Sequence, residues 1–140
     1  MPAVFDRLGI RFQYPDNWTL DDSEASEESP SITVYSPDGA FWSLVVHPGT
    51  VSIEDAASAA LVAMQNEYEQ LDSEEVEDYV VGHPLVGYDL NFYCLDLTNT
   101  ALIRSFADET NTYLILCEAE DREYAEVEPI FKAITHSLLS

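Results

Sequence analysis

The amino-acid sequence predicts an α+β fold, a single antiparallel β-sheet of about six to seven strands flanked by helices. Three observations lead to this prediction. Segments with the two-residue alternation of apolar side chains that is typical of strands precede and follow a segment with helical three- and four-residue spacing. A second helical segment ends the chain. The later strands are joined by short connections, which favour antiparallel neighbours because parallel pairing requires a long crossover.

The first predicted strand covers residues 10–14, where apolar and polar side chains alternate. Pro15 ends this strand because proline has no backbone N–H to donate to a β-ladder. A second strand begins at Trp18 and fades into an acidic loop that ends at Pro30. The chain is therefore expected to open with two short strands.

Residues 32–35 and 41–47 are predicted to form a β-hairpin, because Pro37 and Gly39 between them supply turn geometry. Both faces of residues 41–47 are largely apolar, which predicts a central strand covered on each side, with Trp42 in the core beneath a helix. If only one face is covered, the other leaves an apolar groove for a partner helix or peptide.

Two helices are predicted. The first starts at Ser52, which can cap it, and its apolar stripe continues to about Leu71. At the end of the chain we expect a short helical turn over residues 121–126, followed by the main helix. Pro129 is placed in the first turn of that helix, because proline in a helix interior removes a hydrogen bond.

A strand meander is predicted between the helices, with turns at residues 98–99 and 108–111. Its strands cover residues 76–81, 86–97, 102–107 and 113–118. Cys94 and Cys117, the only cysteines, lie in strands that are separated by one other strand. They are expected about 9–10 Å apart, too far for a disulfide. Each is interpreted as a small buried hydrophobic side chain.

Charge gives the clearest limit on function. The 140 residues carry 27 acidic and 5 basic side chains, a net charge of -22, and 18 of the carboxylates lie in residues 21–28, 67–78 and 118–128. Such a chain repels phosphate backbones and anionic lipids, so we expect no nucleic acid and no anionic membrane as partner. The acidic side chains either keep the domain soluble or attract a basic partner. Self-repulsion predicts a melting temperature that rises with salt up to about 0.15 M.

The sequence offers no catalytic constellation and no dedicated metal site. His47, His83 and His136 are far apart, and a site that joins them to a cysteine needs long-range convergence. The acidic segments lack the calcium-loop signature with its glycine, so only weak, nonspecific divalent binding is expected. We therefore predict no catalytic residues, no enzyme activity and no cofactor.

Residues 1–140 are predicted to form one domain, because this length suffices for one core. The apolar runs are too short for a bilayer span, and the N-terminal residues do not resemble a secretory signal. A cytoplasmic location is the expectation that follows.

The segment from Gly9 to Trp18, with its Phe-x-Tyr-Pro-x-x-Trp motif, resembles the opening of the Mog1/PsbP-like superfamily. Residues 131–138 resemble its closing helix, and the order of elements between them agrees. The superfamily includes a Ran-binding nuclear import factor, an extrinsic photosystem II subunit and bacterial proteins of unknown role. The resemblance implies an α-β-α sandwich and a non-enzymatic docking domain, and it carries over no catalytic residue.

These observations predict a non-enzymatic protein-binding or adaptor module of uncharacterised role. Its apolar sheet face or helix–sheet groove would contact a partner, and the surrounding acid favours a basic or neutral protein. The alternative is a small-ligand carrier or hydrolase with an internal pocket, and a third possibility is a structural subunit of a larger complex. A closed cavity with convergent polar groups favours the carrier or hydrolase, whereas an open apolar groove favours docking.

Overall fold

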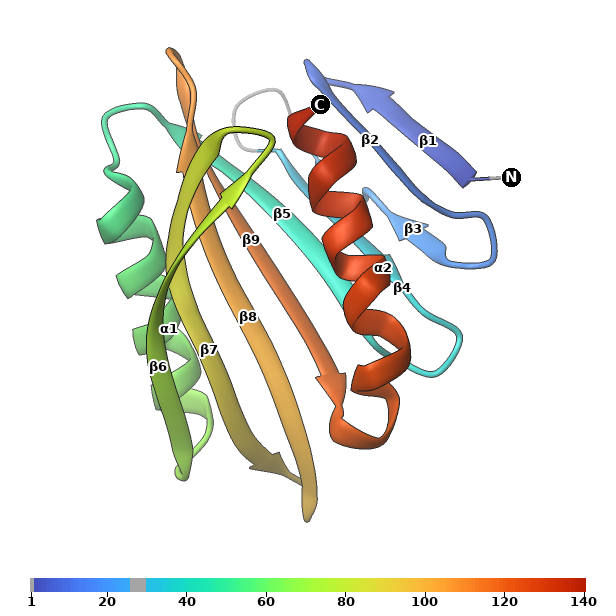
Figure 1. Ribbon diagram of the computed structural model, residues 1–140, viewed down its shortest axis with the longest axis vertical. Helices are drawn as coiled ribbons and strands as arrows, with labels where there is room; N and C mark the ends of the chain where they lie inside the picture. Colours follow the sequence, from blue (N-terminus) through green and yellow to red (C-terminus); the bar gives the residue numbers. More distant parts are fainter. Residues whose placement is uncertain (1, 26–29) are drawn as a thin grey trace.

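The computed structural model describes residues 2–25 and 30–140, which form strands and helices in three layers (Figure 1). The helices are α1 (Ile53–Glu67) and α2 (Asp121–Leu139). The strands are β1 (Pro2–Arg7), β2 (Ile10–Pro15), β3 (Thr19–Asp21), β4 (Ser31–Tyr35), β5 (Phe41–Pro48), β6 (Leu71–Val80), β7 (His83–Cys94), β8 (Leu97–Ala107) and β9 (Asn111–Glu120).

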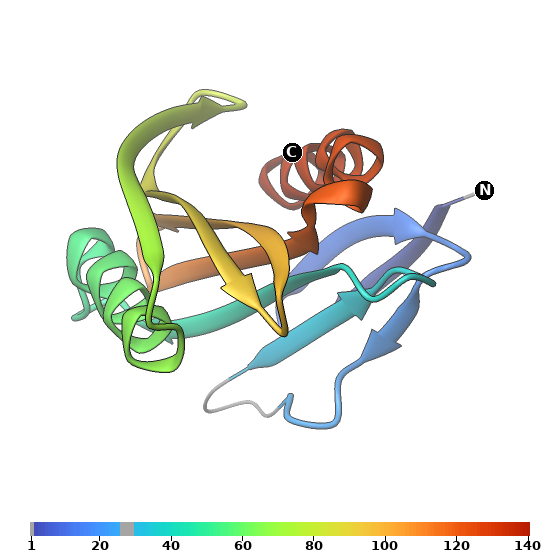
Figure 2. The same cartoon turned by 90° about the horizontal axis from the view of Figure 1, so that it is seen from below.

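Seven strands form one antiparallel sheet in the order β3-β4-β5-β9-β8-β7-β6, and β1 and β2 form a separate two-stranded sheet. Helix α2 lies on one face of the large sheet and α1 on the opposite face (Figure 2). The α+β sandwich with an antiparallel sheet is confirmed. The small sheet is an addition, because the sequence pattern did not predict β1.

An aromatic core lies between α2, β2 and the large sheet. Trp42 on β5 is fully buried, and its indole N–H donates to Thr135 Oγ1 of α2 at 3.0 Å. The ring centroid of Phe12 lies 4.8 Å from that of Trp42, and Trp18 meets Phe131 edge-on at 6.0 Å. The expectation that Trp42 lies in the core beneath a helix is confirmed.

A second, smaller apolar cluster lies beneath α1. Ala57 and Met64 of the helix pack on buried side chains of β7 and β8, such as Leu90 and Ile103. Ser52 caps the helix as predicted, because its hydroxyl accepts from the Asp55 N–H at 3.0 Å.

Helix α1 ends at Glu67, four residues before the predicted end, and β6 begins at Leu71 rather than at residue 76. Tyr68 already has extended backbone angles, φ -121° and ψ 122°. Its ring packs on Phe92 at 4.2 Å between centroids, and Leu71 joins the same cluster. The apolar stripe therefore continues past the helix because the following strand buries its side chains in the same place.

The turn predicted at residues 98–99 is wrong, because the chain reverses at Leu95 and Asp96. Both residues have positive φ, 53° and 65°, which is the geometry of a two-residue type I′ hairpin turn. Leu8 and Gly9, at 59° and 75°, form the equivalent turn between β1 and β2. Neither turn has the Asn-Gly or Asp-Gly pair that usually marks a type I′ turn, so the pattern missed both.

Helix α2 is continuous over its 19 residues, with Pro129 inside it, and the predicted break near residue 126 is wrong. Proline leaves the carbonyl of Ala125 without its helical donor. Ala125 is exposed, so water can replace that hydrogen bond, and the apolar stripe of α2 holds the helix on the sheet.

Cys94 and Cys117 lie on β7 and β9, with β8 between them as predicted, and both are free thiols. Burial raises the pKa of the Cys117 thiol, so this side chain stays neutral. Cys117 therefore packs as a small hydrophobe in the core beneath α2.

Candidate binding groove

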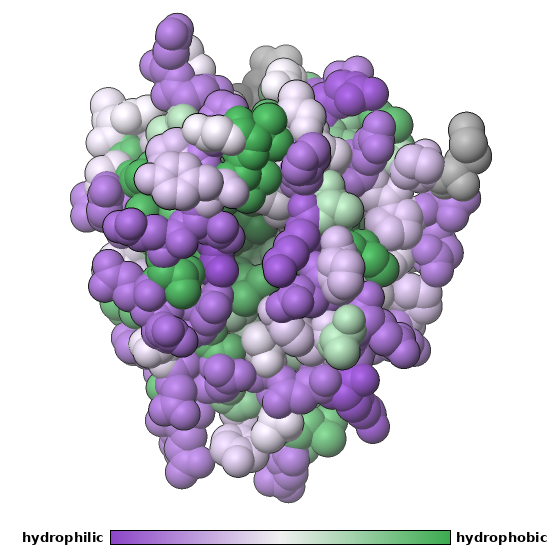
Figure 3. All heavy atoms as spheres, in the orientation of Figure 1, coloured by the Kyte–Doolittle hydropathy of each residue, from purple (hydrophilic) through white to green (hydrophobic). Residues whose placement is uncertain are grey.

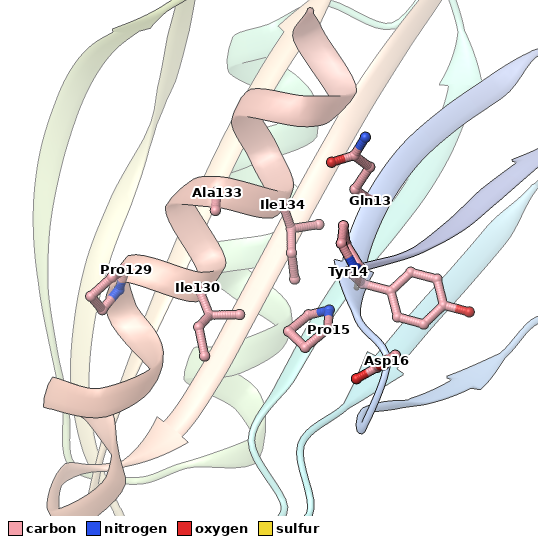
Figure 4. Close-up of a pocket in the computed structure, with 9 residues that line it drawn as sticks. Gln13, Tyr14, Pro15, Asp16, Pro129, Ile130, Ala133 and Ile134 are labelled. Carbon is pink, nitrogen blue, oxygen red and sulfur yellow. The ribbon is translucent and has the colours of Figure 1, made fainter.

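A groove with a volume of about 450 Å³ lies between α2 and the two-stranded sheet (Figure 4). It is open to solvent along one side. The residues that line it come from β1, from the end of β2 and the turn after it, and from the middle of α2: Pro2, Gln13, Tyr14, Pro15, Asp16, Pro129, Ile130, Ala133 and Ile134.

The helical wall of the groove follows from the spacing of its residues. Pro129, Ile130 and Ala133 lie within one turn of each other, and Ile134 follows one turn after Ile130. Figure 4 shows Ile130 and Ile134 pointing toward Pro15 on the opposite wall. Ile134 is only 1% exposed and therefore forms the floor.

The strand wall is fixed to the helix by a hydrogen bond. The Gln13 N–H donates to Ser137 Oγ at 2.9 Å, and that hydroxyl donates to the Ile134 carbonyl at 2.6 Å. The Tyr14 ring turns away from α2 (Figure 4), so the strand side of the groove is made largely by Pro15. This hydrogen bond therefore fixes the position of the strand wall relative to the helical wall.

Apolar side chains dominate this groove, and its polar groups lie at the margin. Gln13 and Asp16 are exposed, whereas Ile134 is buried and Ile130 half-buried. An open apolar surface of this size suits one or two large side chains of a partner. The groove lies between a helix and the small sheet, whereas the conditional groove predicted from residues 41–47 would lie on the uncovered face of β5.

Another cavity, of about 510 Å³, lies beside the turn between β8 and β9 and has more polar walls. There the Asp108 carboxylate accepts from the N–H groups of Thr110 and Asn111 and from the Tyr113 hydroxyl, at 2.7–2.9 Å. Burial acts to raise the pKa of Asp108, but these hydrogen bonds outweigh it and lower the pKa. The Asp108 carboxylate therefore stabilises the turn between β8 and β9.

The three histidines lie on different elements and do not form a cluster. His47 lies on β5, His83 starts β7 and His136 lies in the last turn of α2. Ser140 lies 3.2 Å from His136 Nδ1 but donates to the His136 carbonyl at 2.6 Å, as a helix C-cap does. Over residues 2–25 and 30–140, no three His, Cys, Asp or Glu side chains are placed to hold a metal ion.

Each of the five basic side chains pairs with a carboxylate. Four pairs are exposed: Arg7–Asp22 at 3.1 Å, Arg11–Asp6 at 4.0 Å, Arg122–Glu120 at 2.6 Å and Lys132–Glu128 at 3.8 Å. Because 27 carboxylates face only five cations, the surface is left strongly anionic. In Figure 3 hydrophilic residues cover most of the visible face, around a recess with apolar residues between the β6–β7 hairpin and α2.

The fifth cation, Arg104, is 15% exposed and ties three strands together. Its guanidinium donates to Asp89 at 2.7 Å and to the Ile103 carbonyl at 2.9 Å, and lies 3.7 Å from Asp78 of β6. Opposite it, a Cβ on Gly87 would lie 1.7 Å from the Ile103 carbonyl oxygen, so the close approach of β7 and β8 requires glycine. This cluster is structural.

The expectation that β5 is covered on both faces is wrong for one of them. On the α2 side Trp42 and Leu44 are fully buried, whereas Phe41 and Val45 on the other side are half-buried. Helix α1 packs on β7, β8 and β9, beyond this part of the sheet. Next to Phe41, Glu118 has a pKa raised by burial and by the charge of Glu67.

Solved structures share this PsbP-like fold, in agreement with the resemblance noted from the sequence. The chain matches no protein-family model and no curated protein sequence. It is similar to the PsbP protein CyanoP of Synechocystis, with a TM-score of 0.63 and 13% identity over 98% of this chain and 89% of that one.

Two further structures share the fold. A protein from Bacteroides thetaiotaomicron has a TM-score of 0.65 and 14% identity over 96% of this chain, but only 46% of its own. LpqN of Mycobacterium tuberculosis, which is involved in cell envelope biogenesis, has a TM-score of 0.54 and 13% identity over 96% of this chain and 80% of its own. At these identities the likeness establishes the fold alone. Within the described residues, neither helix is long and apolar enough to cross a membrane.

Proposed function

We propose that this protein is a non-enzymatic adaptor that docks a partner protein in the groove between β2 and α2. The observation that carries the proposal is the open apolar groove, whose walls are fixed to the aromatic core. An open apolar groove favours docking of a protein segment over enclosure of a small ligand.

The chemistry of the groove and of its surroundings defines the partner. Ile130, Ala133 and Pro15 accept an apolar side chain, which anchors the contact. The anionic surface around the groove repels acidic proteins and attracts basic ones before contact. The partner segment is therefore a neutral or basic one that presents one or two large apolar residues.

The proposal includes a cytoplasmic setting. It is supported by two free thiols, Cys94 and Cys117, in a chain that we expect to form no disulfide. Cell fractionation of the source organism tests this part separately, and recovery of the protein outside the cytoplasm would refute it.

A pair of matched variants tests the groove. Ala133→Arg fills it from the helical wall, and Ala63→Arg makes the same change at an exposed position of α1. A photo-crosslinking residue at position 133 or 63 identifies the partner in the source organism, and the purified partner is then titrated. We expect crosslinking from position 133 only, and binding weakened about tenfold or more by Ala133→Arg but not by Ala63→Arg.

Equal binding by both variants would contradict docking in the groove. Native mass spectrometry of the protein purified from its own organism tests the alternative. A small molecule that co-purifies with the wild type but not with Ala133→Arg would show that the protein is a ligand carrier rather than an adaptor.

A further inference from the structure

Strand β6 forms one edge of the seven-stranded sheet, at the outside of the molecule (Figure 1). It pairs with β7 over all ten of its residues without a bulge, from Leu71 opposite Phe92 to Val80 opposite His83. The other edge strand, β3, has only three residues. A long edge strand presents a row of backbone N–H and C=O groups that no neighbour has paired.

The register tells which residues present these groups. Val81 and Gly82, with φ of 52° and 76°, form a two-residue turn, so Val80 and His83 exchange hydrogen bonds and every second pair after them does the same. The remaining residues of β6 direct their N–H and C=O outward: Leu71, Ser73, Glu75, Glu77 and Tyr79. Pro84 fits this register, because it lies opposite Tyr79 in a pair that exchanges no hydrogen bonds.

One outward amide is already satisfied within the strand, because the Tyr79 N–H donates to Asp78 Oδ1 at 3.0 Å. Within the part of the chain that the structure describes, the N–H groups of Ser73, Glu75 and Glu77 have no protein acceptor. Three alternate donors are thus free along about 14 Å of strand, given 3.4 Å per residue.

Proteins usually protect an edge strand by shortening it, by a proline or a bulge, by a covering element, or by charge. Strand β6 is long, continuous and largely exposed, and it contains no proline. Its protection is charge: Asp72, Glu74, Glu75, Glu77 and Asp78. Only Asp78 among these five pairs with a basic side chain, Arg104.

Negative charge does not protect against every partner strand. A second copy of β6 would bring five more carboxylates against the first five, and like charges directly opposite are destabilising. A strand with Lys or Arg at these places gains opposite-charge pairs on both faces of the sheet. We propose that the edge of β6 binds an extended basic segment of a partner protein as an eighth strand.

The side chains of β6 define that segment further. Glu75 and Glu77 point to the α1 side of the sheet, and Asp72 and Glu74 to the α2 side, so basic residues are favoured on both faces. Val76 is half-buried between Glu74 and Asp78, and an apolar residue fits opposite it. This proposal does not depend on the groove, which lies on a different part of the molecule.

Amide hydrogen exchange of the whole chain, followed by NMR, tests the proposal directly. The probe is a synthetic ten-residue peptide of lysines with one central valine at low salt, which places basic residues on both faces, and the control is the same peptide with alternate backbone nitrogens methylated. We expect the unmethylated peptide to slow exchange at Ser73, Glu75 and Glu77 about tenfold, and to leave the inward amides of Glu74 and Val76 unchanged. The methylated peptide keeps the charge but should give no alternating protection.

Charge-reversal variants separate the edge from the acidic surface as a whole. Glu75→Lys with Glu77→Lys should weaken peptide binding about tenfold more than Glu109→Lys with Glu126→Lys, which changes the net charge equally at exposed positions elsewhere. Equal effects of the two pairs, protection without alternation, protection by the methylated peptide, or no protection at all would each overturn strand addition.

Discussion

The half of the molecule beneath α2 and the half that ends in β6 are stabilised by different interactions. Beneath α2, buried aromatic rings such as Phe12, Trp42 and Phe131 pack on one another, and a helix closes over them. At the other end, β6 is mostly exposed, and Arg104 joins it electrostatically to β7 and β8. The first half is a rigid scaffold for the groove, whereas the edge strand of the second half is exposed and carries charges that salt can screen.

This difference indicates where the fold can tolerate change. Removing a ring from the aromatic core leaves a cavity that its rigid neighbours cannot fill. Substituting a residue on β6 exchanges one solvated side chain for another, so the edge can vary its charge with little effect on the fold.

The largest effect is expected in the aromatic core. Trp42→Ala removes the side chain that contacts Phe12 and donates to Thr135, and should lower the free energy of unfolding by about 4 kcal/mol. Tyr79→Ala, at a position 73% exposed on β6, should change it by less than about 0.5 kcal/mol. Urea denaturation measures both, and similar losses would contradict the contrast between the halves.

The second largest loss of stability is expected at the ion pairs of Arg104. Arg104→Met should cost about 2 kcal/mol, because it removes a guanidinium that is only 15% exposed and that donates to the Asp89 carboxylate and to the Ile103 carbonyl. Arg122→Met, which removes an exposed pair of 2.6 Å, should cost less than about 0.5 kcal/mol. If the two variants unfold at the same urea concentration, Arg104 does not hold the strands together.

A smaller, pH-dependent effect is expected at Asp108. Because its pKa is lowered in the folded state, its charge stabilises the protein above the ordinary pKa of about 4, and the contribution is lost as pH falls through the lowered value. Asp108→Asn should therefore cost less than about 1 kcal/mol at pH 7, because the side chain is exposed and solvent screens its charge, and the cost should shrink as the pH falls below about 4. Thermal unfolding from pH 2 to 7 checks this, and a cost that stays constant over this range would show that the charge is not involved.

The smallest effect has the opposite sign. Burial and the charge of Glu67 raise the pKa of Glu118, so the folded state loses stability as pH rises from about 4 through the raised value. Glu118→Gln should therefore stabilise the protein at pH 7 by about 0.5 kcal/mol, because the side chain is partly solvated. The gain should disappear below pH 4, and a variant less stable than the wild type at pH 7 would contradict this sign.

The sequence predicted most of the fold because alternation and helical spacing are strong where one face is buried. Trp42, the cap at Ser52 and the separation of Cys94 and Cys117 by one strand are examples. The type I′ turns were missed because Leu95 and Leu8 are not turn formers, and their positive φ is imposed by the pairing of the flanking strands. Tertiary packing also extends helix α2 through Pro129 against local preference.

The position of the groove could not be predicted from the sequence. Pro15 and Ile130 are 115 positions apart, and no periodicity in the chain indicates that a strand end and a helix face will meet. The full length of the edge strand β6 was not predicted, for a different reason. Residues 72–75 were predicted to lie outside the strand at residues 76–81, because charged residues are depleted in strands.

Salt-dependent amide exchange of the free protein tests the contrast between the halves most directly. As NaCl rises from about 0.01 to 0.15 M, screening should slow exchange of the inward β6 amides, such as Glu74 and Val76, several-fold, with a rise in melting temperature. The amides of β5 and β9 beneath α2, such as Trp42 and Ile115, should change much less. Equal slowing in both regions, or no response in β6, would contradict the division into an aromatic scaffold and a charge-dependent edge.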